Sequence, residues 1–379
     1  MLIRTRNKIE YVLKNTFVGW QTKRQIIVLE SDDWGTVRMS SRDSYQKLLS
    51  FGIPVDKIHY TKYDALESES DLQSLFETLS KYKDSTGRPP VLTANCLMAN
   101  PDFKRIKDND FRHYYFQPVQ ETFSNYPNHE NSFKLWKEGY KNRIFHPQFH
   151  GREHVNVNRW MKALRANLVE TRLAFEHGVF GISMHGSNEK RKSYMEALAA
   201  ETGEEAAQIH EIVAEGLAMF RSSFGYPSAS FIAPNYTWSS DLERTLLRND
   251  VKFIQGNKMQ AEPLLQINGG VFRKVHYTGK RNELGQIYLV RNCHFEPSSA
   301  PKNDWVGECL KRIDKAFRSN RPAIVSSHRV NFIGYLDEKN RNENLRLLAV
   351  LLKTILSRWP EVEFLSTDEL GELIQKNNK

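Results

Sequence analysis

The amino-acid sequence predicts an α/β fold, a distorted (β/α)7-type barrel that is TIM-like in plan and carries helical and loop insertions. Short apolar runs alternate along the chain with longer amphipathic stretches, which is the pattern of a parallel sheet covered by helices. Seven or eight such repeats favour a closed or nearly closed barrel. The chain has 379 residues, and one barrel commonly needs about 250 residues plus insertions. We therefore expect a single barrel domain over residues 1–379.

The candidate strands are segments rich in β-branched and apolar residues. They span residues 26–29, 91–95, 143–146, 179–184, 230–233, 251–255, 286–290, 323–327 and 362–365. Helical periodicity is clear over 158–178, which ends at His177 and Gly178, and over 342–360, which Pro360 stops. The regions near 36–88 and 101–140 do not repeat this alternation, and we interpret them as insertions that decorate the barrel.

Composition excludes several classes of protein. Hydrophobic residues make up 40% of the chain and charged residues 26%, without an apolar run of the about 18 residues that a membrane span needs. The three cysteines are far apart and predict neither a disulfide framework nor a thiolate zinc site. Charges interrupt the apolar residues of the N-terminus, so it does not resemble a secretory signal. We expect a cytoplasmic protein whose basic N-terminus permits peripheral association with a membrane.

The net charge of +9 permits a polyanionic partner. However, acidic residues are mixed into each basic region, and the sequence has no nucleic-acid-binding motif. We expect no nucleic-acid partner. An acidic sugar, or a glycan on an anionic surface, would use the same charge.

The stretch "IIVLESDDWG" ends an apolar run in adjacent carboxylates, Asp32 and Asp33. In a barrel, the loops after the strands build the active-site face. One carboxylate directly after the first strand can hold a metal while its neighbour handles a proton. A turn or helix cap is the alternative interpretation, because Asp is common in both.

A second signal is "RIFHPQFHGREHVNVNRW", which carries His146, His150 and His154 at spacings of four. On a helical turn, the spacing of His150 and His154 places both imidazoles on one face, where they can share one ion. His146 is expected to extend the site or to be structural. Of the other histidines, His185, His276 and His294 are weaker candidates that suit packing better.

Two later strand ends also carry side chains of types that can take part in catalysis. The run "FIAPNYTW" ends at Pro234 and presents Asn235 and Tyr236, although a proline turn with core aromatics would look the same. The run "AIVSSHRVNF" delivers His328 and Arg329 at the end of a buried strand. A histidine there can titrate near neutral pH and act as a general acid.

In this order, the four signals resemble the polysaccharide deacetylase (NodB-like) family of metal-dependent carbohydrate esterases, over residues 26 to about 370. The resemblance implies a distorted barrel of about seven strands, in agreement with the alternation above. It implies Asp33, His150 and His154 as ligands of one divalent metal ion, which we take to be zinc. It also implies Asp32 as the base and His328 as the acid.

Together, these residue types could carry out the hydrolysis of an acetyl group. Two imidazoles and a carboxylate leave a position on the metal for water, whose proton Asp32 would accept during attack on an acetyl carbonyl. A backbone N–H after Pro234, that of Asn235 or Tyr236, would help to hold the developing oxyanion. His328 would protonate the departing sugar atom. The predicted substrate is an acetylated sugar or polysaccharide.

The chain departs from the family pattern at Ile232, where an arginine usually holds the base. A carboxylate base needs one rotamer, and a guanidinium fork holds two oxygens at once. Another strand end must then supply the fork. Arg291 follows the apolar run "IYLV", and Arg329 is the competitor. We predict that Arg291 lies within hydrogen-bond reach of Asp32, at about 2.7 to 2.9 Å.

Two other functions fit the same sequence. A barrel-type glycoside hydrolase requires two carboxylates about 5 to 9.5 Å apart, for which Glu30, Glu153 and Glu296 are the candidates near the site. A catalytically silent glycan-binding protein that keeps the metal site is the other. Acetate release, compared with reducing-end release, separates these functions.

Overall fold

The centre of the protein is a curled parallel sheet. The computed structural model describes residues 19–182, 193–265 and 270–377. The sheet has the strand order β10-β7-β6-β5-β2-β1-β12-β11, and the short β13 pairs with the start of β1. Its strands are β1 (Ile26–Trp34), β2 (Leu92–Leu97), β5 (Phe145–Gly151), β6 (Ser230–Ile232), β7 (Phe253–Gly256), β10 (Ile287–Val290), β11 (Cys293–His294), β12 (Ala323–His328) and β13 (Glu363–Phe364).

The two ends of this sheet meet in one segment of chain. Strand β10 pairs with β7 and strand β11 pairs with β12, and between β10 and β11 lie just Arg291 and Asn292. The backbone N–H of Arg291 bonds to Gly256 on one side, and that of Asn292 bonds to Ile324 on the other. The segment therefore closes a distorted barrel, and the predicted (β/α)7-type fold is confirmed.

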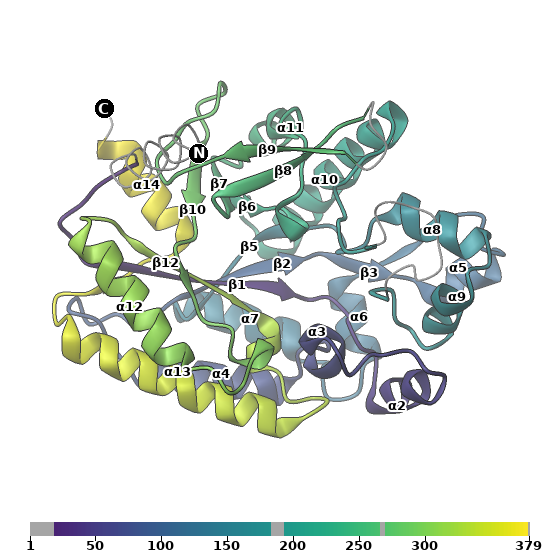
Figure 1. Ribbon diagram of the computed structural model, residues 1–379, viewed down its shortest axis with the longest axis horizontal. Helices are drawn as coiled ribbons and strands as arrows, with labels where there is room; N and C mark the ends of the chain where they lie inside the picture. The colour runs from purple at the N-terminus through teal and green to yellow at the C-terminus, as the bar shows by residue number, and fades with distance from the viewer. Residues whose placement is uncertain (1–18, 183–192, 266–269, 378–379) are drawn as a thin grey trace, which may run out of the picture.

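Helices surround the barrel. In Figure 1, α4, α12 and α13 lie below the central strand β1, and α10 and α11 lie above it. The helices are α2 (Arg42–Ser50), α3 (His59–Tyr63), α4 (Glu69–Ser80), α5 (Phe103–Asp108), α6 (Val119–Asn125), α7 (Ser132–Lys141), α8 (Val157–Arg165), α9 (Val169–Glu176), α10 (Gly203–Phe224), α11 (Leu242–Arg248), α12 (Trp305–Arg318), α13 (Glu338–Arg358) and α14 (Thr367–Asn377). Among the described residues, no helix is long and apolar enough to cross a membrane.

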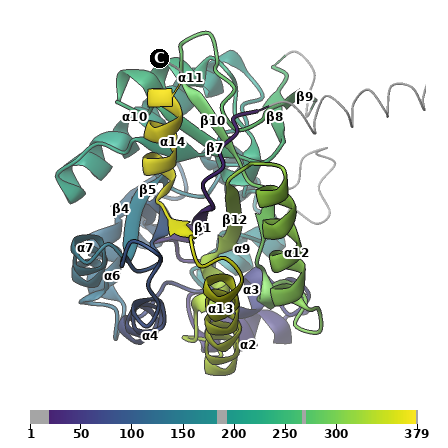
Figure 2. The ribbon, with the colours of Figure 1, turned by 90° about the vertical axis from the view of Figure 1, so that its left-hand side faces the viewer.

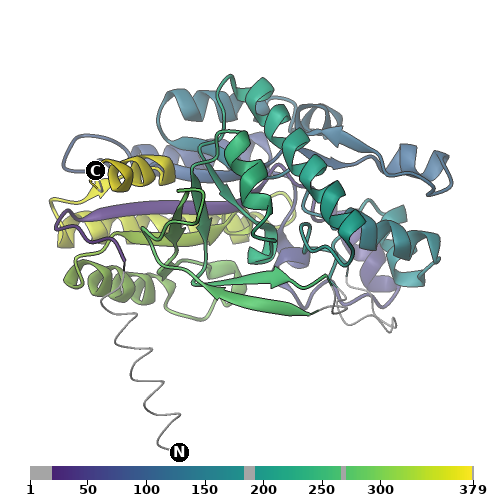
Figure 3. The same cartoon turned by 90° about the horizontal axis from the view of Figure 1, so that it is seen from above.

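Two short antiparallel pairs of strands lie outside the barrel sheet. They pair β3 (Ala99–Pro101) with β4 (Phe116–Pro118), and β8 (Met259–Pro263) with β9 (Val271–Val275). Figure 3 shows the β8–β9 hairpin, in green, running along the outside of the molecule. Single turns of 3-10 helix follow three barrel strands, at Pro234–Tyr236, Pro297–Ser299 and Arg329–Phe332.

The side chains of β1 alternate between two apolar clusters, as the pleat of a strand requires. Ile27 and Leu29 pack outward with residues of the surrounding helices. Ile26 and Val28 point inward and pack with Leu370 and Ile374 of α14. Figure 2, viewed toward the starts of the strands, shows α14 in front of this end of the barrel. The C-terminal helix therefore fills the end of the barrel at which the strands begin. We call this the lower end, and the end at which the strands finish the upper end.

Above this apolar layer the barrel interior is polar. The Gln255 amide donates to Asn95 Oδ1 at 2.9 Å and to Ser230 Oγ at 2.8 Å. The Gln148 side-chain oxygen accepts from the Ser230 backbone at 2.7 Å. All four side chains are buried, so these bonds compensate for their removal from water. They form a rigid floor beneath the upper end of the barrel.

The structure corrects several predicted boundaries. Strand β1 continues through Asp32 and Asp33 to Trp34, and β5 continues through His150 to Gly151. The expected helix over 158–178 is two helices, α8 and α9, separated near Asn167, which has a positive φ of 53°. Residues 179–182 of the expected strand 179–184 are not a strand, and the remaining two lie outside the described residues. The N-terminal residues 1–18 also lie outside them.

Candidate metal centre and active site

Asp33, His150 and His154 come together at the upper end of the barrel. Each offers one ligand atom, and these atoms all lie within 4.8 Å of one another. Asp33 Oδ1 is 3.4 Å from His150 Nε2 and 3.2 Å from His154 Nε2. All three residues are buried. The predicted set of three is therefore assembled in space.

Local backbone irregularities bring the three side chains together. Adjacent residues of a strand normally face opposite sides of the sheet, yet Asp32 and Asp33 both face the upper interior. Asp33 has a φ of +75°, and the pairing of β1 with β2 shifts register between Ser31 and Trp34. His150 lies in strand β5, and His154 lies in the loop after Gly151. The expectation that both imidazoles lie on a helical turn is wrong.

Hydrogen bonds fix how Asp33 and His150 present their atoms. The carbonyl of Ile232 can accept but not donate, so the 2.9 Å contact with His150 Nδ1 assigns the proton to Nδ1. Nε2 is thus the ring nitrogen that could bind a metal ion, and it lies towards Asp33. Arg38 donates to the other Asp33 oxygen, Oδ2, at 2.9 Å. Arg38 thereby directs Oδ1 towards the two imidazoles, a contact that the sequence analysis missed.

The protonation states suit a divalent cation, whose ligands must be deprotonated. Burial, followed by the charge of Arg38, lowers the pKa of His154 to about 4. Burial would raise the pKa of Asp33, but Arg38 and His154 outweigh it and hold that pKa well below its usual range. At neutral pH His154 is therefore a neutral imidazole and Asp33 a carboxylate. This donor set fits zinc or a similar ion.

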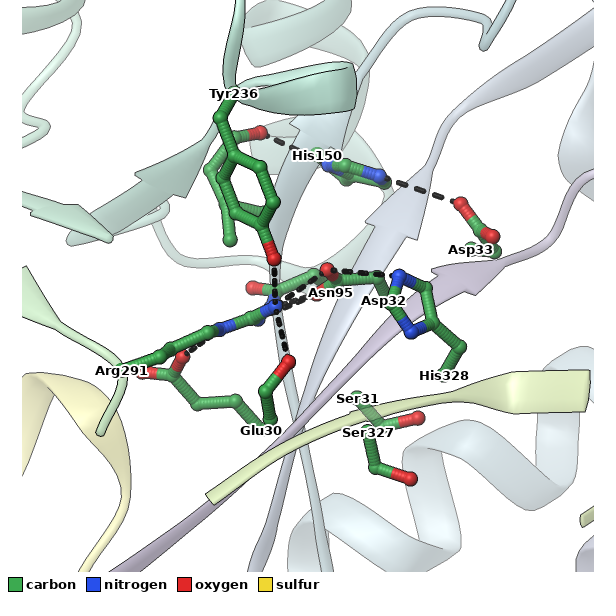
Figure 4. Close-up of polar contacts among 12 residues, drawn as sticks. Glu30, Ser31, Asp32, Asp33, Asn95, His150, Tyr236, Arg291, Ser327 and His328 are labelled. Carbon is green, nitrogen blue, oxygen red and sulfur yellow. Dashed lines mark hydrogen bonds and ion pairs between the residues drawn. The ribbon is translucent and has the colours of Figure 1, made fainter. Parts of the chain in front are cut away.

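Asp32 is held by the guanidinium of Arg291. Arg291 donates from Nη1 to Asp32 Oδ2 at 2.7 Å and from Nη2 to Asp32 Oδ1 at 2.6 Å, as Figure 4 shows. The predicted contact is confirmed. Burial would raise the pKa of Asp32, but Arg291 outweighs it and lowers the pKa to about 2. The competitor Arg329 instead pairs with Asp64 and Glu67, and Ile232 is buried in the core.

Two buried residues complete the support of Asp32, and the sequence analysis did not identify either role. Asn95 donates from its amide to Asp32 Oδ1 at 2.7 Å. Glu30, two residues before Asp32, accepts from Arg291 Nε at 2.5 Å. The side chain of Arg291 is 0% exposed, and it spans both carboxylates at once. The base candidate is thus locked in one rotamer.

His328 lies on the other side of Asp32. Its Nε2 is 3.7 Å from Asp32 Oδ2, and its Nδ1 is 2.6 Å from Glu296 Oε1. Burial would lower the pKa of His328, but Glu296 and Asp32 outweigh it and raise the pKa to about 9. Glu296 also accepts from the Asn331 amide at 2.7 Å, which fixes its position. The His328 ring is therefore protonated on both nitrogens, and positively charged, at neutral pH.

These groups share one cavity of about 450 Å³. Its lining includes Asp32, Asp33, His150, His154 and His328, together with Arg38, Tyr60, Asn235 and Tyr236. The Tyr236 backbone N–H donates to Ala233 at 3.0 Å, so it is not available as the predicted oxyanion donor. The Tyr236 hydroxyl instead accepts from Arg291 at 3.2 Å. Asn235, which has a φ of +53°, also lines this cavity.

Other sequence candidates lie elsewhere. His146 is at the opposite end of β5, where it contacts Asp368 of α14 at 3.0 Å. His276 is buried and stacks on Tyr288 with ring centroids 3.8 Å apart. His185 lies outside the described residues. His294 lines a second cavity, which shares Tyr60 and His328 with the first.

Several solved structures have folds similar to that of this chain. No known family profile and no curated protein matches the sequence. A solved structure of a probable polysaccharide deacetylase from Pseudomonas aeruginosa PAO1 is similar, with 7% identity, 92% of this chain and 91% of that chain covered, and a TM-score of 0.45. A 4-alpha-glucanotransferase from Thermococcus litoralis aligns at 9% identity over 91% of this chain and 40% of that chain, with a TM-score of 0.44.

The α-amylase AmyC from Thermotoga maritima aligns at 9% identity over 92% of this chain and 74% of that chain, with a TM-score of 0.44. The family that the sequence motifs resemble is therefore represented among the similar solved structures. At such low identities and TM-scores these similarities do not assign an activity. The functional assignment rests on the geometry of the site.

Proposed function

We propose that the protein is a metal-dependent deacetylase that removes acetyl groups from an acetylated sugar or polysaccharide. The observation that carries this proposal is the position of Asp32. It is fixed by Arg291, adjoins the Asp33, His150 and His154 group, and faces protonated His328 across one cavity. A base, a metal-binding group and an acid in one cavity are the components that hydrolysis of an acyl bond requires.

Each residue has a defined task in this proposal. A divalent ion, when bound by Asp33, His150 and His154, supplies a Lewis acid for an acyl oxygen and lowers the pKa of water. Asp32 accepts the proton of the attacking water, and Arg291 keeps its two oxygens oriented. His328 donates its Nε2 proton to the departing nitrogen or oxygen of the sugar. The backbone of Asn235 remains the candidate for an additional oxyanion donor.

The geometry is less favourable for cleavage of a glycosidic bond. That reaction needs two carboxyl groups that flank the bond within the cavity. Glu30 is fully buried beneath Arg291, and Glu153 is buried against Arg152. Glu296 holds His328 through a short hydrogen bond. The carboxylates near the site are thus engaged as supports of other side chains.

Acetate release tests the proposal. The purified protein, stripped of metal and then reconstituted with zinc or other divalent ions, is incubated with a panel of N-acetylated and O-acetylated sugars and oligosaccharides. We expect metal-dependent acetate release without new reducing ends. The matched control is His146→Ala, which changes a histidine of the same strand far from the cavity. New reducing ends would favour a glycoside hydrolase, and silence on the whole panel with retained metal would favour a glycan-binding protein.

A further inference from the structure

A permanent positive charge lies beside the candidate metal-binding group. Arg38, in the loop between β1 and α2, donates from Nη2 to Asp33 Oδ2 at 2.9 Å. Its side chain is 10% exposed, and that of Asp33 is 2% exposed. Arg38 lines the same cavity as His150 and His154. The Asp33 carboxylate is therefore shared, because one oxygen binds an arginine while the other faces the two imidazoles.

A buried network holds Arg38 in this position. Arg38 Nε is 3.7 Å from Asp64 Oδ2. Asp64 pairs with Arg329 at 3.0 Å, and Arg329 pairs in turn with Glu67 at 2.6 Å, all three with side chains that are 0% exposed. Glu67 accepts from the backbone N–H of Gly35 at 3.0 Å. Positive and negative charges alternate along this network, so Arg38 is attracted to a buried carboxylate on each side.

Such an arginine has two opposite effects on a metal site. A residue that hydrogen-bonds to a metal ligand orients it, and removal of such a residue typically lowers metal affinity or activity about 10- to 100-fold. A cation, however, repels a divalent ion and takes up part of the negative charge of the shared carboxylate. Water and salt screen this repulsion only weakly between buried groups. The net effect of Arg38 depends on which of the two effects is larger.

The orientation of Asp33 depends little on Arg38. Its two carboxylate oxygens are chemically equivalent, so either of them can face the two imidazoles. The backbone is fixed independently before and after Asp33, because Asp32 is held through both of its oxygens and the N–H of Gly35 is bound to Glu67. The charge of Arg38 is therefore the larger effect.

We propose, on the basis of the proposed function, that Arg38 weakens the binding of the divalent ion and strengthens the action of that ion as a Lewis acid. Arg38 is in this sense a positioning residue that acts through Asp33. A carboxylate shared with a guanidinium gives less negative charge to the ion, which leaves more of the ion's charge for the acyl oxygen of the substrate. Arg38 also compensates the buried charge of Asp33 in the metal-free protein, so the site stays assembled while ions exchange.

The zinc affinity of the full chain, measured at neutral pH by competition with a chromophoric chelator, tests this proposal. Arg38→Met removes the charge and keeps an unbranched side chain, and we expect it to bind zinc at least about 10-fold more tightly than the wild-type protein. Its turnover at saturating zinc should nevertheless fall by about 10-fold. Arg38→Lys keeps a positive charge and should bind zinc with nearly the wild-type affinity. Arg38→Gln, which is uncharged but polar, replaces Arg38→Met if that variant does not fold.

Arg341→Met is the matched control. The side chain of Arg341 is 11% exposed and pairs at 3.0 Å with that of Asp71, which is 1% exposed, so this pair is buried to the same degree as Arg38 and Asp33. Neither Arg341 nor Asp71 lines the metal-site cavity. Arg341→Met should lose a similar amount of stability but keep the wild-type zinc affinity. An equal gain of affinity in this control would overturn the proposal, because the charge beside Asp33 would then not be the cause.

Zinc affinity equal to or below that of the wild-type protein in the uncharged Arg38 variants would overturn the proposal. Unchanged turnover in a variant that binds zinc more tightly would overturn the part that concerns the Lewis acid. Zinc binding by the wild-type protein without any acetate release would refute the proposed function and that same part, whereas the comparison of zinc affinities would still decide whether Arg38 repels the ion. If the wild-type protein binds no zinc, binding gained in Arg38→Met would support the repulsion, and absence of binding in that variant as well would overturn it.

Discussion

Replacement of Arg291 by lysine tests whether the fork, and not merely the charge, supports the site. The guanidinium forms three short bonds, one to Glu30 and two to Asp32, from a fully buried position. The single ammonium of a lysine can approach one of the two carboxylates. The other carboxylate is then a buried charge without its cation, and Asp32 is no longer held through both oxygens.

The expected loss of stability follows from these bonds. Hydrogen bonds to charged groups contribute about 1.5 to 3 kcal/mol each, and breaking a buried ion pair typically costs about 3 to 5 kcal/mol. Two bonds are lost, but proton uptake by Glu30 offsets part of the cost, because burial already raises the pKa of Glu30. We expect Arg291→Lys to lose about 3 to 5 kcal/mol of unfolding free energy, measured by urea denaturation. Turnover should fall at least about 10²-fold.

Two further variants separate stability from catalysis. In Glu30→Gln with Arg291→Lys, the carboxylate left without a partner becomes a neutral amide, so we expect stability to recover by about 1 to 2 kcal/mol while turnover stays low. Arg329→Lys is the matched control, because Arg329 is equally buried and also bridges two carboxylates, Asp64 and Glu67. It should lose comparable stability but less activity per folded molecule. Wild-type turnover in Arg291→Lys would refute the requirement for the fork.

The remaining predictions concern the metal and the acid and base. His150→Ala and His154→Ala should each lose stoichiometric metal after dialysis, measured by elemental analysis, whereas His146→Ala should retain it; retention in both of the first two would remove the assigned site. Asp32→Asn and His328→Ala should keep the metal but lower turnover by about 10²-fold or more, and a near-wild-type rate would remove that residue from its role. In metal-free protein, the raised pKa of His328, about 9 against its ordinary 6.5, contributes stability that is complete below pH 6.5 and lost as the pH rises through about 9. The unfolding free energy of the wild-type protein relative to His328→Gln should therefore decline over that range, and a constant difference would contradict the charged state.

The residues proposed to bind the metal ion and to act as base and acid were predictable, because hydrolysis of an acyl bond requires these residue types. A carboxylate base needs a fork, and the apolar run that precedes Arg291 predicts that this arginine lies at the same end of the barrel as Asp32. The residues that hold Asp32, Arg291 and His328 in position were not predictable. Glu30, Asn95 and Glu296 are ordinary residues of apolar or polar runs in the sequence. Their roles depend on strand register and on which neighbouring strand end each side chain meets.

The histidine spacing shows how periodicity can mislead. A spacing of four brings side chains together on a helix, but in a strand it separates them by about 13 Å at 3.3 Å per residue. His146 and His150 share strand β5, so they lie at opposite ends of the barrel. His150 and His154 meet because the chain turns after Gly151, whose φ is +154°. Sequence spacing alone cannot distinguish these backbone paths.

The C-terminal helix α14 has a consequence for the order in which the protein is assembled. Its first residue, Thr367, donates to Glu30 Oε1 at 2.7 Å, and Glu30 in turn binds Arg291. The metal-site residues lie in β1, in β5 and in the loop after β5, which leave the ribosome early, whereas α14 is synthesised after every strand of the barrel. A nascent chain can therefore hold all three metal-site residues while the lower end of its barrel is still open to water. We expect the support of Asp32 to become complete only when translation reaches this helix.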